Sequence, residues 1–251
     1  MKNNILLLGG TGTLGKTIIK SNLFKNLYHP SRKILNILDK SKIENYLIKN
    51  KINIIIHCAA LARVKECEKN KKKAYKTNIL GTKNVASSVA NCFKKKNLNI
   101  KLVFMSSDGV YPSTKGNYKE SDKLKPYNYY GLTKLEGEKI VKKLNDYIII
   151  RTRFFDKNNI KFKYAATNIF TSSIEVNKLS LYIYKIIKKK FKGVINVGGK
   201  KVSDYKKYKK YKKNIKPCDK TVIFNSTNVK LASDASLNLK KFNRLIWNTP
   251  P

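Results

Sequence analysis

The sequence is poor in acidic residues, and its few cysteines and histidines are not arranged to bind a metal. Fifteen Asp and Glu stand against 55 Lys and Arg, which gives a formal net charge of +40. Four cysteines and two histidines form no CxxC pair and no metal-ligand spacing, so we expect free thiols and no metal site. No apolar run is long enough to span a bilayer, so no membrane partner is expected. The N-terminal segment shows no signal-peptide cleavage pattern, which predicts a cytoplasmic protein.

The positive charge comes almost entirely from lysine. Only five of the 55 basic residues are Arg, and the chain holds 50 Lys, 28 Asn and 27 Ile among its 251 residues. AT-rich codons encode all three of these residue types, so a strongly AT-rich coding sequence accounts for the bias without any function. Faces that bind nucleic acid rely on Arg for two-point contacts. We therefore expect no nucleic-acid partner.

One segment keeps the nucleic-acid alternative open. Residues 203–213 interleave Tyr with Lys, as proteins that bind single strands do. However, Tyr205, Tyr208 and Tyr211 are spaced by three, which places them on one face of a helix that Ser203 would cap. A surface helix that packs on its tyrosine face is the interpretation we favour.

Apolar segments typical of buried strands alternate with helical segments along the first 150 residues. Strands are expected at 4–8, 52–57, 100–105 and 147–150, and helices at about 13–25, 41–49, 69–94 and 127–143. Strands rich in Ile, Leu and Val that alternate with helices predict an α/β fold, a Rossmann-type doubly wound parallel sheet. We expect residues 1–153 to bind NAD(P) and to carry the chemistry. Residues 154–251, with a helix at 176–189 and a strand at 193–197, would form a smaller substrate-binding lobe that can return elements to the main sheet.

A glycine-rich turn follows the first expected strand. Residues 9–15 read Gly9, Gly10, Thr11, Gly12, Thr13, Leu14 and Gly15. In a dinucleotide site such glycines allow the tight turn, the close approach of a pyrophosphate to the backbone, and the packing of helix on strand. The following helix then presents free N–H groups and its positive end to the phosphates.

Two further segments carry groups suited to catalysis. Ser106, Ser107 and Asp108 follow the expected strand at 100–105, at the edge where open parallel sheets bind ligands. Tyr130 and Lys134 lie four residues apart and would share one helix face.

Together, these segments resemble the extended short-chain dehydrogenase/reductase family, and within it the dTDP-4-dehydrorhamnose reductase branch of sugar-nucleotide reductases. The similarity covers about residues 5–153, and a weaker likeness extends to 232–238. It is carried by the glycine turn, by His57 to Glu68, by Ser106 to Tyr111, by Gly116 to Asp122 and by Pro126 to Glu138.

The resemblance implies a role for each site residue. Tyr130 would protonate a carbonyl oxygen while hydride reaches its carbon, Lys134 would stabilise the phenolate and hold the nicotinamide ribose, and Ser107 would fix the reacting oxygen. Asn78 would tie backbone near the site. The cofactor would meet Gly9, Gly10, Thr11, Gly12, Thr13, Leu14, Gly15, Ser31, Arg32, Asn36, Ile37, Cys58, Ala59, Ala60, Asn78, Met105, Tyr130 and Lys134. The substrate would meet Arg63, Val64, Ser107, Asp108, Tyr130, Arg153 and Phe154.

The charges near the second strand favour NADPH over NADH, although NADH remains the alternative. NAD-specific sites place an acidic residue there for the ribose 2′-hydroxyl. This chain has no acidic residue before Asp39, and it carries Arg32, one of only five arginines, where such an acid would stand. A guanidinium suits a 2′-phosphate. Asn36 departs from the Asp that the family often carries near the adenine.

The predicted reaction is reduction of a nucleotide-linked 4-keto-6-deoxysugar, as in the dTDP-L-rhamnose pathway. Dehydratases of the superfamily need an Asp-Glu pair after the hydroxyl residue, but here Gly109 follows Asp108. A 4-epimerase is an alternative that the NADPH preference disfavours. Another is a non-catalytic regulatory subunit, as this fold provides in methionine adenosyltransferase. Arg153 could meet a diphosphate or pair with an acid, and a homodimer is possible; the sequence decides neither.

Overall fold

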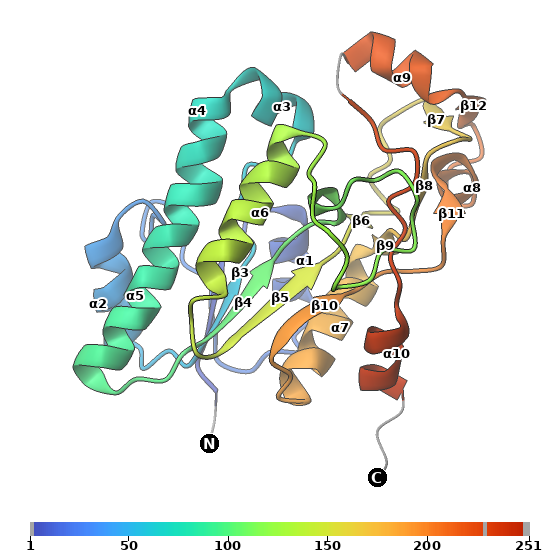
Figure 1. The fold of residues 1–251 in the computed structure, drawn as a ribbon. Helices are drawn as coiled ribbons and strands as arrows, with labels where there is room; N and C mark the ends of the chain where they lie inside the picture. The colour runs from blue at the N-terminus through green and yellow to red at the C-terminus, as the bar shows by residue number, and fades with distance from the viewer. Residues whose placement is uncertain (1–2, 228–229, 248–251) are drawn as a thin grey trace.

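A parallel six-stranded sheet forms the centre of the computed structural model, which describes residues 3–227 and 230–247 (Figure 1). The strand order is β10-β5-β4-β3-β1-β2, and each neighbouring pair is parallel. This order confirms the predicted Rossmann-type sheet. From β1 the chain adds β2 on one side, and from β3 onward it adds strands on the other side of β1, so the strand order switches between β1 and β3. The strands are β1 (Ile5–Leu8), β2 (Leu27–Tyr28), β3 (Ile54–His57), β4 (Lys101–Met105), β5 (Tyr147–Arg151) and β10 (Gly193–Asn196).

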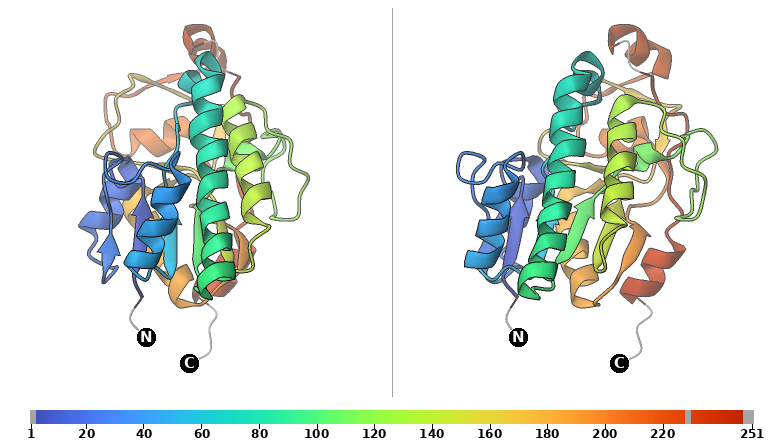
Figure 2. Two further views of the ribbon diagram at one scale, coloured as in Figure 1. Left: turned by 90° about the vertical axis from the view of Figure 1, so that its left-hand side faces the viewer. Right: turned by 60° about the vertical axis from the view of Figure 1, so that its left-hand side comes forward.

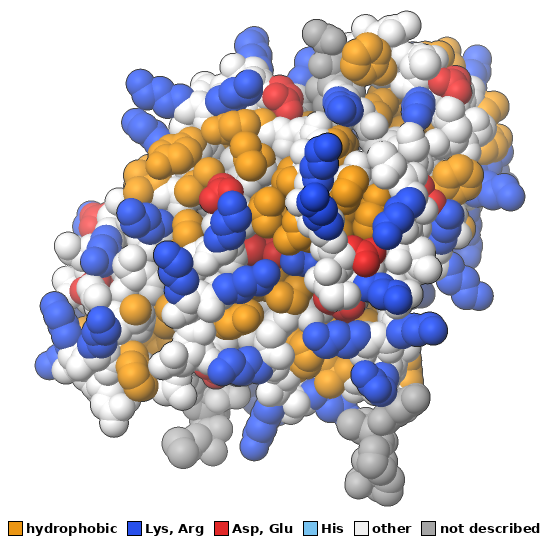
Figure 3. Space-filling model, viewed as in Figure 1, with side chains coloured by type: hydrophobic (Ala, Val, Ile, Leu, Met, Phe, Trp, Pro, Cys, Tyr) orange, Lys and Arg blue, Asp and Glu red, His pale blue; other side chains and the backbone are white. Residues whose placement is uncertain are grey.

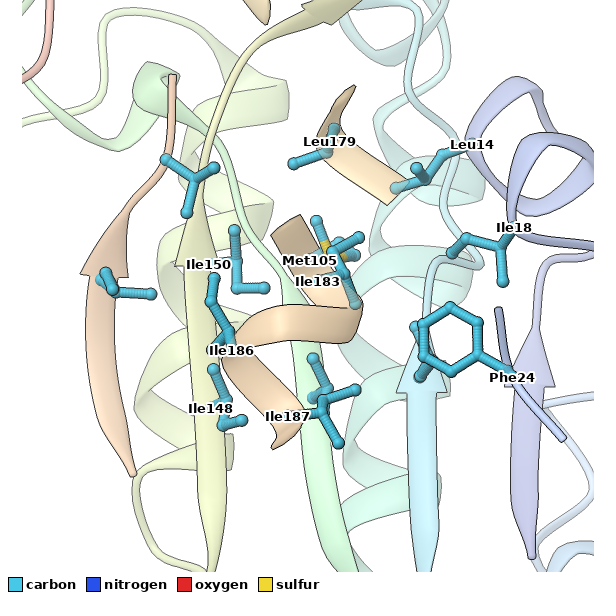
Figure 4. Close-up of a cluster of buried hydrophobic side chains, with 14 of the residues drawn as sticks. Leu14, Ile18, Phe24, Met105, Ile148, Ile150, Leu179, Ile183, Ile186 and Ile187 are labelled. Carbon is cyan, nitrogen blue, oxygen red and sulfur yellow. The ribbon is translucent and has the colours of Figure 1, made fainter. Parts of the chain in front are cut away.

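Helices cover both faces of the sheet (Figure 2). On one face lie α1 (Thr13–Lys20) and α7 (Val176–Lys188), and on the other lie α2 (Lys40–Lys49), α5 (Gly81–Lys96) and α6 (Tyr129–Val141). Side chains alternate along β1, because Ile5 and Leu7 join the first core and Leu6 and Leu8 join the second. Figure 4 shows the first core, where Leu14 and Ile18 of α1 meet isoleucines of α7 over the sheet.

The C-terminal part of the chain contributes to the main sheet and builds a small lobe at its carboxyl edge. Strand β10 pairs with β5, and α7 packs against α1. Among the described residues, the lobe holds three two-stranded ladders and two short helices, whereas α10 (Lys240–Trp247) packs against α7 and β10 of the main domain. The elements of the lobe are β6 (Phe154–Phe155), β7 (Tyr164–Ala166), β8 (Phe170–Thr171), β9 (Ile174–Glu175), β11 (Val202–Ser203), β12 (Lys216–Cys218), α8 (Asp204–Lys209) and α9 (Lys220–Thr227).

Two predicted helices differ from the observed ones. Helix α1 ends at Lys20 rather than near residue 25, since Asn22 adopts a left-handed backbone with φ of 51°. The helix expected over 69–94 is divided into α3 (Val64–Lys69), α4 (Lys71–Ala74), the π-helical turn η1 (Tyr75–Leu80) and α5. Such π turns often occur at functional sites.

The Tyr-Lys segment forms a helix whose packing agrees with the prediction in part. Ser203 caps α8 as predicted, by accepting a hydrogen bond from the Lys206 amide. Tyr208 packs edge-on against Phe155 and Phe162, as a helix packed on its tyrosine face requires. Tyr211 contacts Phe155 but is 42% exposed and lies beyond the helix end, and the most buried side chain of the helix is Lys207, which is 6% exposed. The predicted tyrosine face is therefore confirmed for Tyr208, and Lys207 shares the buried side of the helix.

On the face that Figure 3 shows, Lys and Arg side chains are spread out rather than gathered in one patch. Within residues 3–227 and 230–247, no helix is both long and apolar enough to cross a membrane.

Candidate active site

The glycine turn after β1 has the geometry of an anion cradle. Gly9 has a φ of 90°, and a Cβ there would lie 2.6 Å from the Ala59 backbone nitrogen. A Cβ on Gly15 would overlap the Gly9 carbonyl oxygen, so helix and turn pack backbone to backbone. Gly12 is the N-cap of α1, no side chain caps the helix, and its first turn holds no acid. The N–H groups of that turn are therefore available to a phosphate.

A cavity of about 220 Å³ lies beside this turn, between the ends of β1 and β3. Most of the predicted cofactor residues line it, in three separate segments of the chain. They are Gly9, Gly10, Thr11, Gly12, Arg32, Asn36, Ile37, Cys58, Ala59 and Ala60. Five further residues line the cavity that were not predicted, each next to a predicted one, namely Leu8, Pro30, Leu35, Leu38 and Thr77.

Other predicted cofactor residues lie outside that cavity. The Leu14 and Met105 side chains belong to the hydrophobic core, and Gly15 is buried against the turn. Thr13 begins α1 and is exposed, and the exposed Ser31 accepts backbone hydrogen bonds through its carbonyl oxygen. The Asn36 amide oxygen accepts from the Leu38 amide at 3.1 Å, which fixes this loop beside the cavity.

A second cavity, of about 410 Å³, lies at the carboxyl ends of β4 and β5. Six of the seven predicted substrate residues line it, namely Val64, Ser107, Asp108, Tyr130, Arg153 and Phe154. Arg63 does not; it is exposed at the start of α3, where its carbonyl oxygen accepts from the Cys67 amide.

The lobe closes this second cavity with four residues that were not predicted as site residues, namely Ile169, Asp204, Ile223 and Lys230. Asp204 lies in the Tyr-Lys segment, and the other three lie in segments with no recognisable motif. Only the folded chain brings them to the sheet edge. Thr152 also lines the cavity, and its buried hydroxyl has no hydrogen-bond partner among the described residues.

Tyr130 stands in the second cavity as a protonated phenol. Burial raises its pKa well above the ordinary value, and the nearby Asp108 carboxylate and the Cys67 thiol raise it further. Arg153 opposes this shift. Tyr130 is therefore protonated, and a cation that stabilises its phenolate would be needed for it to release that proton readily.

Lys134 lies one turn further along α6 and is almost fully buried. Its ammonium lies 4.1 Å from the centre of the Phe104 ring, an attractive contact between a cation and an aromatic face. Gly137 makes room for that ring, because a Cβ there would lie 2.6 Å from Phe104 Cζ. Burial lowers the pKa of Lys134 to about 8, although Cys58 and Glu138 oppose the shift. The expected support of the Tyr130 phenolate by Lys134 stays a prediction.

Asn78 ties three segments together behind the site. Its side chain accepts from the Leu61 amide at 2.7 Å and donates to the Leu61 carbonyl at 3.0 Å. It also donates to the Thr133 hydroxyl at 3.0 Å, and Thr133 donates to the Tyr130 carbonyl at 2.7 Å. Asn78 lies within the π turn η1, so this irregular turn holds both the loop after β3 and the start of α6.

A buried ion pair joins β5 to α6, the helix that carries Tyr130 and Lys134. Arg151 donates to both carboxylate oxygens of Glu138, at 2.9 Å from Nε and 2.7 Å from Nη2. Glu138 also accepts from the Ser106 hydroxyl at 2.6 Å, and Arg151 donates to the Tyr111 hydroxyl at 2.8 Å. Burial lowers the pKa of Arg151, but Glu138 outweighs that effect and keeps the guanidinium charged.

The fold is that of an extended short-chain dehydrogenase/reductase, with a glycine turn lining one cavity and with Ser107 and Tyr130 lining the other, whereas Lys134 lines neither cavity. The family described as RmlD substrate binding domain matches residues 1–172. The chain belongs to this family.

Individual relatives agree with that assignment. The chain is similar to the crystal structure of dTDP-4-dehydrorhamnose reductase from Bacillus anthracis in complex with NADP, with a TM-score of 0.84 and 27% identity over 98% of this chain and 93% of that one. Methionine adenosyltransferase 2 subunit beta from Bos taurus is 31% identical over 55% of this chain and 42% of its own length. dTDP-4-dehydrorhamnose reductase from Aggregatibacter actinomycetemcomitans is 29% identical over 59% of this chain and 50% of its own. The chain thus spans half or less of these two curated relatives.

Proposed function

We propose that this protein is an NADPH-dependent reductase of a nucleotide-linked 4-keto-6-deoxysugar. The observation that carries the proposal is the meeting of Ser107 and Tyr130 in one cavity, next to a glycine cradle that suits a pyrophosphate. The Bacillus anthracis relative, crystallised with NADP, supports the choice of cofactor. Arg32 lines the cradle and would meet the 2′-phosphate that distinguishes NADPH from NADH.

The residues of this chain divide the work of such a reduction. A bound nicotinamide would supply the hydride. Tyr130 holds the proton that the carbonyl oxygen needs as it becomes a hydroxyl, and a cation beside its phenolate would help it to release that proton. Ser107 fixes the oxygen close to Tyr130, and Lys134 holds the nicotinamide ribose. Val64, Phe154 and Ile169 give the cavity apolar walls that limit water.

The direct test is whether the purified protein reduces a 4-keto sugar nucleotide with NADPH. Purified protein with NADPH and dTDP-4-dehydro-L-rhamnose is expected to lose the near-ultraviolet absorbance of NADPH, and a panel of 4-keto sugar nucleotides would identify the preferred sugar and base. Tyr130→Phe removes the proton donor and is expected to slow this reaction by at least about 100-fold. An unchanged rate in Tyr130→Phe would show that another group is the acid.

Two alternatives give different results in the same assay. A sugar-nucleotide epimerase interconverts two sugars with no net consumption of NADPH. A regulatory subunit binds NADPH but turns over no member of the panel, and the likeness to methionine adenosyltransferase 2 subunit beta is the observation that keeps this alternative.

A further inference from the structure

Two acidic side chains, Asp108 and Asp204, line the cavity that Ser107 and Tyr130 share. Asp108 is enclosed and already paired, because its Oδ2 lies 2.7 Å from Arg153 Nε and its side chain is only 2% exposed. The Asp204 side chain is 19% exposed, so a molecule bound in the cavity can reach it. Of the two acids, Asp204 is therefore the one that is available to a substrate.

The backbone fixes the position of Asp204. Strand β11 ends at Ser203, and α8 begins at Asp204 with the Ser203 hydroxyl as its cap. The Asp204 amide donates to the Ile169 carbonyl at 2.9 Å, next to β8, the strand that pairs with β11. A ladder and a capped helix thus hold this acid, and a fixed acceptor loses little freedom when it binds a ligand.

The protein binds one oxygen of the Asp204 carboxylate and leaves the other without a partner. Lys207 Nζ lies 2.6 Å from Asp204 Oδ1, and the same ammonium is held by the Ser173 hydroxyl at 2.6 Å and the Thr171 hydroxyl at 3.2 Å. Within residues 3–227 and 230–247, Asp204 Oδ2 has no hydrogen-bond partner and is not among the polar atoms sealed from solvent. A carboxylate oxygen accepts hydrogen bonds and donates none, so Asp204 offers the cavity an acceptor.

Arg153 does not occupy that oxygen. Its guanidinium contacts Asp108 and donates from Nη2 to the Tyr127 hydroxyl at 3.2 Å. Asp204 acts on Arg153 through space, by raising its pKa. The free oxygen therefore suits a donor from the substrate. In a sugar nucleotide the ring hydroxyls are donors, whereas the diphosphate is an anion that a carboxylate repels.

We infer that Asp204 accepts a hydrogen bond from a ring hydroxyl of the sugar and thereby determines which sugars the protein accepts. The inference rests on the proposed function, in which Ser107 and Tyr130 hold the C4 carbonyl oxygen and the sugar keeps hydroxyls on C2 and C3. A site built to bind a hydroxyl disfavours the analogue that lacks it, because the protein group is then left unpaired.

The test compares dTDP-4-dehydro-L-rhamnose with its 2-deoxy and 3-deoxy analogues. Asp204→Asn keeps an acceptor for Lys207 but removes the charge, so kcat/KM for the full sugar is expected to fall about 3- to 10-fold. The double variant Asp204→Leu, Lys207→Met removes the whole ion pair and leaves no buried charge, and there the expected fall is about 10- to 100-fold. For the analogue that lacks the bound hydroxyl, both variants are expected to match the wild type within about twofold.

Asp156→Asn is the matched control in the same lobe. The Asp156 carboxylate accepts from the Asn158 amide at 2.9 Å, and Asp156 does not line the cavity. This substitution is expected to leave kcat/KM unchanged for all three sugars. An equal loss for the three sugars in the Asp204 variants would overturn the inference, because Asp204 would then act through the fold of the lobe.

Calorimetry separates the sugar from the diphosphate. The double variant is expected to bind dTDP-L-rhamnose about 10- to 100-fold more weakly and dTDP alone with unchanged affinity, since dTDP carries no sugar. Tighter binding of dTDP by the variant would place Asp204 beside the diphosphate and overturn the inference. A wild-type protein that turns over no sugar nucleotide would overturn the proposed function instead, and these binding measurements would still report whether Asp204 contacts the sugar.

Discussion

The Arg151 guanidinium contacts the Glu138 carboxylate at two points, and both side chains are at most 1% exposed. This pair joins strand β5 to helix α6. Glu138 also accepts a hydrogen bond from Ser106, and Arg151 also donates one to Tyr111, so both charged groups have further hydrogen-bond partners. Removal of one member of a buried pair leaves the other as an uncompensated charge, which costs more than the pair itself contributes.

Glu138→Gln is therefore expected to lower the free energy of unfolding by about 3 to 5 kcal/mol. Glu136→Gln is the matched control on the same helix, because Glu136 pairs with Lys139 at 2.7 Å near the solvent. That change should cost less than about 1 kcal/mol. Urea unfolding of both variants measures the difference, and similar losses would contradict the role given to the buried pair.

The stability of the protein should increase between about pH 8 and pH 10 because of Lys134. Burial lowers the pKa of Lys134 in the folded protein from 10.5 to about 8, so within this interval the unfolded chain binds the extra proton. Below pH 8 the buried, charged ammonium lowers the free energy of unfolding by roughly 3 kcal/mol. This loss disappears as the pH rises above 8, because the folded protein then holds Lys134 neutral.

Lys134→Met is expected to remove that part of the pH dependence and to raise stability at pH 7. Unfolding curves across this pH range measure the effect against the control Lys139→Met, on an exposed position of the same helix. If Lys134→Met and Lys139→Met had the same pH dependence, Lys134 would not be buried as a charged group.

Arg32 should determine the preference between the two nicotinamide cofactors. Arg32→Gln removes a guanidinium that lines the cradle, and the loss of its bonds to a phosphate is expected to weaken NADPH binding about 10- to 100-fold. NADH binding should stay nearly unchanged. Fluorescence titration of both cofactors measures this, with the neighbouring Lys33→Gln as the control. An equal loss for both cofactors would show that Arg32 does not read the 2′-phosphate.

Gly15 and Gly12 of the turn should differ in how far a substitution by Ala destabilises the protein. Gly15→Ala places a Cβ against the Gly9 carbonyl oxygen and is expected to cost about 1 to 3 kcal/mol of stability. At Gly12 the nearest atom to a new Cβ is the same oxygen at 3.5 Å, so Gly12→Ala should cost well under 1 kcal/mol. Thermal unfolding without cofactor separates this packing effect from any effect on binding.

The sequence by itself determined the features that depend on neighbouring residues. The glycine turn, the hydroxyls that end β4 and the Tyr130–Lys134 spacing are local patterns, and the alternation of strands and helices predicted the parallel sheet that the structure confirms. The scarcity of acids before Asp39 made Arg32 stand out, and Arg32 does line the cradle.

Only the tertiary structure decided which charges meet. The sequence left Arg153 between a diphosphate and an acid, and the fold places it 2.7 Å from Asp108. The fold also places Lys134 over the Phe104 ring, and it brings Ile223 and Lys230, from segments without a motif, to the cavity that Ser107 and Tyr130 line. The strand order and the return of the C-terminal chain to the sheet bring together residues far apart in sequence, and contacts of that kind leave no periodic pattern in any single segment.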